Sequence, residues 1–549
     1  MSGGEGAGPT VRDAAMALLR ERGLTTIFGN PGSTELGLLR DFPEDFRYTL
    51  ALHEGVAVAM ADGYAQATGH PALVNLHSAC GVGNAMGAVV NAFHNRAPLV
   101  ITAGNQDRRH LELEPYLFAR STALMEPYVK FSHEPARPQD VPAAIDRAWA
   151  LARTPPQGPT FVSIPSGDWD APASVDDAGA DGHAAADPRE RDVLVGAGAG
   201  EDLLDRLAER IEAAGAPALI VGGGVDQACA WDEVAELAER LGGPVWTAPQ
   251  APRLGFAEDH PLYQGHLAPG RATAAAQLAG RDLALVLGAP VFAFLPYEPG
   301  AAALPQIIHV TDDPSEAARA RVLSVVADVG SVARGLSERL RPRSPAPPVA
   351  PRPAPEPVDA PAGGPVPPAF LMAALGRALP DDAVLVEESP SNRNALRAQV
   401  WIRRPASFFA TASGGLGFAM PAAVGIKLAS PERPVVCLVG DGSALYVAQT
   451  LWSAVQLGAA VTFVIVNNGR YAILEAAARF GGLEGLPSME LPGLDFLSLA
   501  SAFGCHGVRI SEPAELPGAL AAAMRANVPV LLDVVVDPAP IPLLASEAP

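Results

Sequence analysis

Short apolar runs alternate with longer helical patterns along most of the 549-residue chain, and this alternation limits the folds that the chain can adopt. In the first part of the chain, runs such as TTIFG, PALVNL and PLVITAG alternate with patterns such as EGVAVAMADGYAQATG. Strands that alternate with helices in this way form parallel sheets covered by helices. The sequence therefore predicts an α/β fold built from doubly wound parallel sheets.

The alternation occurs in three blocks separated by segments that cannot form a core. A stretch rich in Ala, Gly and Asp follows the first block, and a proline-rich segment follows the second. Proline-rich sequence is extended and acts as a spacer. The chain is also too long for a single core. We therefore expect domains at residues 1–180, 190–342 and 369–549, with a linker at residues 343–368.

The composition excludes several classes of partner. The formal net charge is −21, which disfavours binding to nucleic-acid phosphates and anionic lipid. The sequence has no run of about twenty apolar residues and no visible secretion signal. Its four cysteines are scattered without metal-ligand spacing. These features predict a cytoplasmic protein that binds neither membranes nor nucleic acids.

The strongest chemical signal lies in the third block. One apolar run ends at the sequence GDGS, which contains Asp441, and the next apolar run ends at Asn468. In a βαβ unit both strand ends lie at the same edge of the sheet, where α/β proteins bind ligands. Carboxylate and amide oxygens suit Mg²⁺, which also binds phosphate oxygens. Two ordinary polar turns are the alternative, but their pairing across one βαβ unit favours a site for a metal ion and a diphosphate.

This motif resembles the signature of thiamine-diphosphate-dependent enzymes, and the resemblance extends over the whole chain. Those enzymes have three α/β domains, which are a pyrimidine-binding domain, a middle domain and a diphosphate-binding domain. The resemblance implies thiamine diphosphate and Mg²⁺ as cofactors, with Asp441, Asn468 and the main-chain carbonyl of Arg470 as metal ligands. The residues that it implies at the cofactor are Glu54, Ser389, Ser391, Gly414, Leu416, Asp441, Gly442, Ser443, Asn468 and Tyr471.

Glu54 begins the pattern EGVAVAMADGYAQATG. Taken alone, it fits an exposed acid in the first turn of a helix, where the helix dipole favours negative charge. The resemblance implies instead that Glu54 hydrogen-bonds N1′ of the cofactor and so favours loss of the C2 proton. It also implies that the Gly414 carbonyl accepts a hydrogen bond from the 4′-amino group of the cofactor. Leu416 would support the bent conformation of the cofactor. Because each site in this family combines domains of two subunits, we expect a homodimer or homotetramer.

Within the family, the chain is most similar to the benzoylformate decarboxylases. The shared runs include FGNPGS, DFPEDFRY, NLHSA and GAPVF. By this resemblance, Ser33 contacts a substrate carboxylate and His77 transfers protons, a task that suits an imidazole. A histidine at a strand end is otherwise more often structural. The residues implied to line the substrate pocket are Pro31, Ser33, His77, Leu295, Leu474 and Ala477.

Two residues differ from those of the benzoylformate decarboxylases. Leu295 aligns with a second active-site histidine, and Ala477 aligns with an aromatic residue. The first change removes a proton donor, and the second frees roughly 100 Å³ of side-chain volume. We therefore expect a non-oxidative decarboxylase of a small-molecule 2-keto acid that carries an aryl or bulky group, with Glu54, His77 and Ser33 as its catalytic residues.

Three other interpretations remain. Slower protonation would favour a carboligase or lyase that makes or cleaves 2-hydroxy ketones. An acetolactate-synthase-like or flavin-dependent enzyme would use a nucleotide in the middle domain, where VGGGVDQA is an incomplete binding fingerprint. A non-catalytic binding or regulatory subunit would keep the same fold, since fold does not establish function.

Overall fold

The computed structural model describes residues 8–174, 193, 198–292, 294–295, 297–298, 303–343, 349–538 and 541. The domain boundary expected at residues 180–190 and the linker residues 344–348 lie outside this part of the chain. The chain forms two compact units. Unit 1 extends to residue 195 and also includes residues 413–430 and 447–459, and unit 2 contains the other residues.

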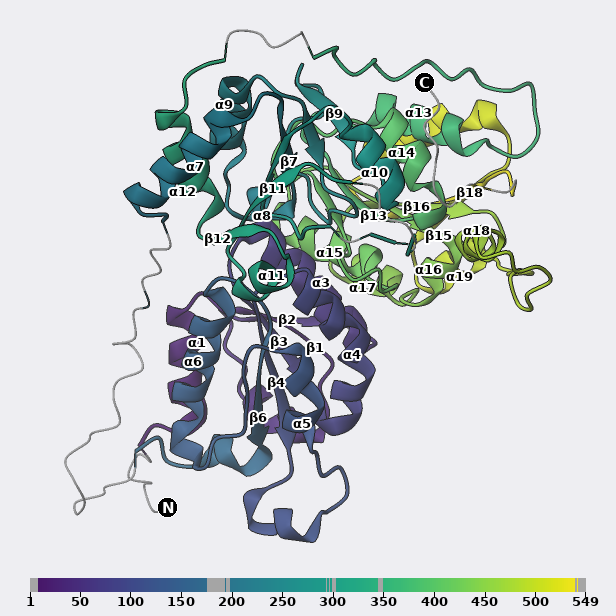
Figure 1. The fold of residues 1–549 in the computed structure, drawn as a ribbon. Helices are drawn as coiled ribbons and strands as arrows, with labels where there is room; N and C mark the ends of the chain where they lie inside the picture. The colour runs from purple at the N-terminus through teal and green to yellow at the C-terminus, as the bar shows by residue number, and fades with distance from the viewer. Residues whose placement is uncertain are drawn as a thin grey trace, which may run out of the picture. The chain divides into compact units, whose positions relative to one another are not determined.

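Unit 1 is built around one parallel sheet of six strands (Figure 1). In sheet order, its strands are β2 (Arg47–Leu50), β1 (Thr26–Gly29), β3 (Ala72–Leu76), β4 (Leu99–Asn105), β6 (Thr160–Pro165) and β5 (Ser132–His133). Its helices are α1 (Val11–Glu21), α2 (Leu36–Leu39), α3 (Glu54–Thr68), α4 (Ser78–His94), α5 (Ser121–Met125), α6 (Val141–Arg153), α15 (Ala419–Ala429) and α17 (Thr450–Gln456).

Unit 2 contains two further parallel sheets of six strands. The middle sheet consists of β12 (Leu323–Val326), β11 (Gln306–Thr311), β10 (Leu283–Leu287), β7 (Pro217–Val221), β8 (Val245–Thr247) and β9 (Tyr263–His266), in that order. The C-terminal sheet consists of β14 (Phe408–Ala410), β13 (Val384–Glu388), β15 (Val435–Gly440), β16 (Val461–Asn467), β18 (Val530–Val535) and β17 (His506–Ile510), in that order.

The helices of unit 2 divide between these two sheets. Those of the middle sheet are α7 (Glu201–Ala213), α8 (Gly223–Gln227), α9 (Trp231–Leu241), α10 (Arg271–Gln277), α11 (Pro314–Arg319) and α12 (Val329–Arg339). Those of the C-terminal sheet are α13 (Pro368–Ala378), α14 (Arg393–Gln399), α16 (Asp441–Leu445), α18 (Ala472–Phe480), α19 (Phe496–Ala502) and α20 (Leu516–Met524).

The expected fold class is confirmed, because every strand pair in the three sheets is parallel and helices flank each sheet. The apolar runs TTIFG, PALVNL and PLVITAG contain β1, β3 and β4. These strands are buried almost throughout, so they lack a polar side. Such runs are typical of parallel strands that are covered on both faces. No helix in the described residues is long and apolar enough to cross a membrane.

The two sheets of unit 2 share a continuous apolar core. One cluster of buried side chains extends from the helices of the middle sheet, including Leu204 and Val332, to strands of the C-terminal sheet, including Val464. Backbone hydrogen bonds also join the two parts. The N–H of Glu258 donates to the carbonyl of Ile402 over 3.0 Å. Because apolar burial and hydrogen bonds both cross between the sheets, unit 2 forms a single compact body.

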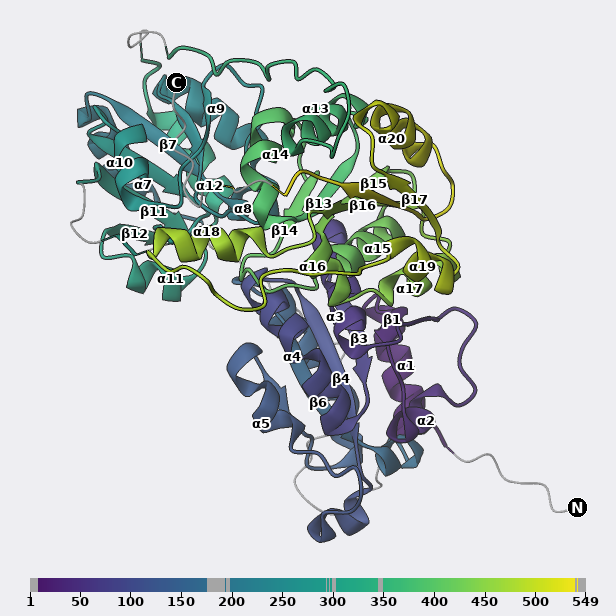
Figure 2. The same cartoon turned by 90° about the vertical axis from the view of Figure 1, so that its right-hand side faces the viewer.

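Helices α3 and α15 cross closely within unit 1, as both views show (Figure 1, Figure 2). A β-carbon at Gly63 would overlap the backbone of Ala422, and one at Gly425 would overlap the backbone of Met60. Two glycines thus allow the helix backbones to touch. This contact anchors α3, the helix that begins with Glu54.

Replacing Gly425 with alanine tests the importance of this crossing. The added methyl group has no space, and overpacking of this kind costs roughly 1–3 kcal/mol, so we expect Tm to fall by several degrees. Gly518→Ala is the matched control, because Gly518 is exposed on α20 and its β-carbon would meet no atom within 4 Å. Thermal unfolding followed by circular dichroism measures both variants. Equal Tm values for the two variants would show that the close approach of the helices is unimportant.

Candidate active site

Three neighbouring strands of unit 2 end at one edge of the C-terminal sheet, where the expected cofactor loops begin. Ser389 directly follows β13, Asp441 directly follows β15 and Asn468 directly follows β16. These strands are adjacent and parallel, so the structure brings the three residues to the same edge, as expected for βαβ connections. Ser391 lies in the short 3₁₀ turn that follows Ser389.

The Asp441 carboxylate is held by backbone N–H groups from two of these loops. It accepts hydrogen bonds from the N–H groups of Gly442 (2.7 Å), Asn468 (3.1 Å) and Gly469 (2.7 Å). Asp441 is 3% exposed, and this burial raises the pKa of its carboxyl above the ordinary value. A buried carboxylate held by neutral donors suits a cation, because the cation would offset its charge.

The loop after β16 is tightly folded. Oδ1 of Asn468 accepts a hydrogen bond from the N–H of Arg470 (3.1 Å), and the N–H of Tyr471 donates to the carbonyl of Met489 (2.8 Å). The Tyr471 ring lies against Gly442, where a β-carbon would be 2.5 Å from Cε1 of the ring. The motif therefore needs glycine at residue 442 for packing. Ser443, the next residue, is buried within α16.

An open cavity of about 450 Å³ borders this loop and is lined by residues 467–470, 490–494 and 538. Among the described residues, no three His, Cys, Asp or Glu side chains gather into a metal cage. The donors at this edge are a carboxylate, an amide and main-chain carbonyls, with space beside them for phosphate oxygens. This donor set fits Mg²⁺ bound to a diphosphate better than it fits Zn²⁺.

A second group of expected site residues lies in unit 1, after two neighbouring parallel strands. The loop that contains Pro31 and Ser33 follows β1, and His77 follows β3. The backbone of Gly32 packs so closely against the His77 ring that a β-carbon at residue 32 would overlap it. The structure therefore brings the loop of Ser33, which is exposed, to the side of His77.

Sequence reasoning missed Glu35, which orients the His77 ring. Nδ1 of His77 lies 2.8 Å from Oε2 of Glu35 and 3.0 Å from Oγ1 of Thr34. Glu35 is 1% exposed and also accepts hydrogen bonds from the N–H groups of Gly32 (2.8 Å) and Gly104 (2.9 Å). A carboxylate only accepts hydrogen bonds, so Nδ1 carries the hydrogen and Nε2 is the nitrogen left for a ligand. No sequence motif identifies Glu35, because Gly32 at the start of this turn has no side chain to complete a capping box.

Glu54 is only 8% exposed, so its interpretation as an exposed acid at a helix start is wrong. It begins α3 after His53, whose Nδ1 accepts a hydrogen bond from the N–H of Gly55 (3.0 Å). The carboxylate points to the first turns of α4. Its Oε2 accepts a hydrogen bond from Nδ2 of Asn84 (3.1 Å), and a β-carbon at Gly81 would lie 2.9 Å from its Oε1. Asn84 therefore holds Glu54 in one orientation, a role that the sequence did not reveal.

The segment that contains Gly414 and Leu416 is anchored to α4 within unit 1. Nδ2 of Asn91 donates a hydrogen bond to the carbonyl of Gly415 (3.2 Å), and the hydroxyl of Ser413 donates to Oδ1 of Asn91. Gly414 has a φ of +75°, a left-handed conformation that favours glycine. These contacts give a defined shape to the loop that is expected beside the bend of the cofactor.

The remaining expected pocket residues lie on two different parts of unit 2. Leu474 and Ala477 are one turn apart on α18, and both are exposed. Leu295 lies beyond β10 and is 70% exposed, and its N–H donates a hydrogen bond to the carbonyl of Pro269 (3.0 Å). These three side chains are outside the apolar core, so changes in them leave the packing of unit 2 intact.

Models of one enzyme family match most of the chain. Residues 9–125 match the N-terminal TPP-binding domain of thiamine pyrophosphate enzymes, residues 204–336 match the central domain, and residues 391–534 match the C-terminal TPP-binding domain. The loops described above and the whole middle sheet fall within or beside these ranges, as do the other two sheets except for β5 and β6.

Individual proteins are similar to this chain over nearly its full length. A benzoylformate decarboxylase of Pseudomonas aeruginosa is 44% identical, with 96% of this chain and 98% of that protein aligned. The structure of a 4-hydroxybenzoylformate decarboxylase of Rhodococcus jostii superposes with a TM-score of 0.90 at 42% identity, covering 96% of this chain and 99% of that one. A benzoylformate decarboxylase of Polynucleobacter necessarius superposes with a TM-score of 0.92 at 37% identity, covering 97% and 100%. The chain belongs to the family of thiamine pyrophosphate enzymes.

Proposed function

We propose that this chain is a decarboxylase that uses thiamine diphosphate and Mg²⁺ to convert an aryl or bulky 2-keto acid into an aldehyde and CO₂. The observation that carries the proposal is the Glu35–His77 pair beside the Ser33 loop, in a chain similar over its whole length to benzoylformate decarboxylases. This arrangement offers a hydroxyl for the substrate carboxylate and an imidazole for proton transfer.

When bound, thiamine diphosphate supplies a nucleophilic carbon and accepts the electrons that remain after CO₂ leaves. Glu54 is the residue that would hold a proton at N1′ of its aminopyrimidine. The hydrogen bond from Asn84 keeps the Glu54 carboxylate oriented for this contact. The carbonyl of Gly414 would accept a hydrogen bond from the 4′-amino group, and Leu416 would support the bent conformation.

Mg²⁺ would be held at the edge of the C-terminal sheet by Asp441, Asn468 and the main-chain carbonyl of Arg470. The buried Asp441 carboxylate, surrounded by N–H donors, supports this assignment. The further contacts that we propose with the cofactor are those of Ser389, Ser391, Gly442, Ser443 and Tyr471.

The substrate would bind beside Pro31, with its carboxylate at the exposed hydroxyl of Ser33. Nε2 of His77 would first take up a proton and then deliver it to complete the aldehyde, because the hydrogen on Nδ1 is held by Glu35. Leu474 and Ala477 would face the aryl group, and the small alanine favours a large substituent. Leu295 would contribute an apolar surface instead of a proton donor.

We also propose a homodimer or homotetramer in the cytoplasm, with the domain boundaries expected above. In this family a site combines the first domain of one subunit with the third domain of another, and the residues assigned here fall into two units. The four cysteines are all free, which supports a reducing compartment.

A carboligase or lyase acting on 2-hydroxy ketones is the second candidate. Two features favour it, namely the apolar Leu295 at a position where a proton donor is expected and the small Ala477 on α18. Slower protonation would give an acceptor aldehyde time to react, and the larger space would admit it.

Product analysis separates the two functions. Incubation with benzoylformate, thiamine diphosphate and Mg²⁺ should release CO₂ and benzaldehyde in equal amounts, measured by headspace analysis and chromatography. If the same mixture with added acetaldehyde gives mainly acyloin, the chain is a carboligase. No CO₂ from benzoylformate or its larger analogues would contradict the proposed decarboxylation.

Glu54→Gln tests activation of the cofactor. The variant keeps the shape of the side chain but cannot hold a proton at N1′. Exchange of the C2 proton with deuterium, followed by NMR, should therefore slow by at least about a hundredfold, while the cofactor still binds. Glu44→Gln, on an exposed side chain, is the control and should exchange at the normal rate. Full exchange in the Glu54 variant would show that the proton relay is assigned wrongly.

Binding of Mg²⁺ and cofactor should weaken as pH falls. Burial raises the pKa of Asp441 above 3.8, and the protonated acid cannot bind a cation, so affinity is lost as pH falls through this raised pKa. Below it, affinity should drop by about tenfold per pH unit, because one proton competes with the metal ion. Calorimetric titrations between pH 7 and acid pH measure the effect.

Asp441→Asn provides the control for this titration. Its weaker binding should retain only the pH dependence of the cofactor phosphates, so the difference between the two profiles belongs to Asp441. Identical profiles for the variant and the original chain would rule out Asp441 as the metal ligand.

A further inference from the structure

The turn that follows β13 is built around a buried carboxylate. Glu387 is the fourth residue of β13, and its side chain is completely buried. Its Oε1 accepts a hydrogen bond from the N–H of Ser389 (2.6 Å). Ser389 directly precedes the 3₁₀ turn Pro390–Asn392, which contains Ser391. Glu387 therefore fixes the start of one of the loops assigned above to the cofactor.

Hydrogen bonds within the turn hold the backbone on both sides of Ser391. The N–H of Asn392 donates to the carbonyl of Ser389 (2.9 Å), and Nδ2 of Asn392 donates to Oγ of Ser389 (3.1 Å). Ser389 and Asn392 are buried, whereas Ser391 is partly exposed. Ser391 is therefore the residue of this turn that a phosphate group reaches most easily, and its buried neighbours determine its position.

Arg393, the first residue of α14, neutralises the Glu387 carboxylate. Two guanidinium nitrogens, Nε and Nη2, each lie 2.9 Å from Oε2 of Glu387. The third nitrogen, Nη1, donates a hydrogen bond to Oε1 of Gln250 (2.7 Å), which follows β8 of the middle sheet. All three nitrogens of Arg393 are thus engaged with Glu387 and Gln250, so the guanidinium is held in one orientation.

The charge of Glu387 has to be balanced if an anionic diphosphate is to bind at the same sheet edge. Like charges repel strongly where water is excluded, and a buried carboxylate is poorly screened. Asp441 would be balanced by Mg²⁺ in the proposed site, whereas Glu387 has no proposed contact with the metal ion. Arg397, one turn further along α14, contributes to the same field, but Arg393 is the cation within hydrogen-bond distance of Glu387.

We propose that Arg393 is a positioning residue for the cofactor, which neutralises Glu387 so that the diphosphate can bind at the Ser391 turn. This inference rests on the proposed binding of thiamine diphosphate at this edge. Arg393 acts through Glu387 and does not contact the ligand, because its nitrogens are already occupied. Through Gln250 the same guanidinium joins the turn to the middle sheet, so the middle sheet supports cofactor binding without a nucleotide of its own.

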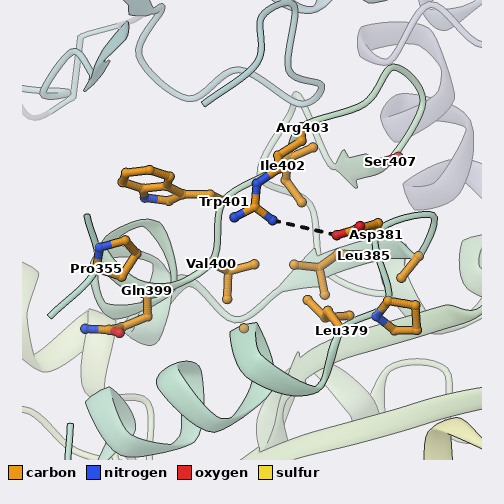
Figure 3. A pocket seen from close by; sticks show the side chains of 13 residues that line it. Pro355, Leu379, Asp381, Leu385, Gln399, Val400, Trp401, Ile402, Arg403 and Ser407 are labelled. Atoms are coloured by element: carbon orange, nitrogen blue, oxygen red, sulfur yellow. Dashed lines mark ion pairs between the residues drawn. The ribbon is translucent and has the colours of Figure 1, made fainter. Parts of the chain in front are cut away.

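The opposite end of α14 offers a matched comparison. It borders a cavity of about 70 Å³, and Figure 3 shows an ion pair between Arg403 and Asp381 (4.0 Å) across one side of this cavity. Arg403 also pairs with Asp259 (3.2 Å), which lies between β8 and β9 of the middle sheet. Like Arg393, Arg403 thus joins the two parts of unit 2, but its pairs are exposed and water screens them.

Calorimetric titration of the full chain with thiamine diphosphate and Mg²⁺ tests the proposal, at pH 8 so that carboxyl groups are ionised. Arg393→Met keeps most of the apolar stem but leaves the charge of Glu387 unbalanced, so Kd for the cofactor should rise by at least about tenfold. Arg403→Met removes only exposed pairs and should keep the original Kd. The same Kd for the Arg393 variant and the original chain would overturn the proposal.

Removing both charges separates an electrostatic role from a structural one. Glu387→Gln keeps an oxygen for the N–H of Ser389 but removes the negative charge, so the double variant with Arg393→Met should return to within about threefold of the original Kd. A purely structural role would leave the double variant as weak as Arg393→Met, because both lack the contact with Gln250, and this result would contradict the proposal. The double variant buries no unpaired charge, so it decides the question even if Arg393→Met fails to fold.

Inorganic pyrophosphate with Mg²⁺ is the second probe, because it carries the charge of the diphosphate without the thiamine rings. The four proteins should show the same order of Kd values with this probe as with the cofactor. Failure of both ligands to bind the original chain would overturn the inference. Neither titration depends on decarboxylation, so a chain that binds both ligands in the expected order but releases no CO₂ would contradict only the proposed reaction.

Discussion

Parallel pairing of neighbouring strands determines where the proposed catalytic residues lie. All strands of a parallel sheet end at the same edge, so the loops that follow them collect there. In unit 1 this brings the Ser33 loop to His77, and in unit 2 it brings Asp441 to Asn468. Each of these residues is far from its neighbour in sequence. An antiparallel connection would send alternate loops to opposite edges and separate them.

Three buried carboxylates lie where the proposed chemistry would take place. Glu35, Glu54 and Asp441 are each at most 8% exposed, and each accepts hydrogen bonds from N–H groups. Burial of a carboxylate is costly, and donors from the backbone or an amide offset the cost and hold the group in one orientation. Glu35 orients His77, whereas Glu54 and Asp441 are the carboxylates proposed to contact the cofactor and the metal ion.

The proposed activation of the cofactor and the choice of product depend on different parts of the molecule. Glu54 and Asp441 belong to buried, hydrogen-bonded sites at the starts of helices. Leu295, Leu474 and Ala477 are exposed and contribute little to the core. Substitution at such exposed positions costs little stability, whereas substitution at a buried hydrogen-bonded carboxylate leaves its donors unpaired. The product can therefore vary while the activating residues stay the same.

The sequence by itself determined the three parallel sheets and the loops at their edges, because long apolar runs and glycine turns are local signals. It also predicted that Asp441 and Asn468 meet at one sheet edge, as the structure shows, and the family resemblance suggested Glu54 and His77 as site residues. Only the tertiary structure revealed Glu35 as the partner of His77, Asn84 as the donor to Glu54, and the short edge strands β9 and β14. These features arise from contacts between residues far apart in the chain, and such contacts exist only after the core has packed.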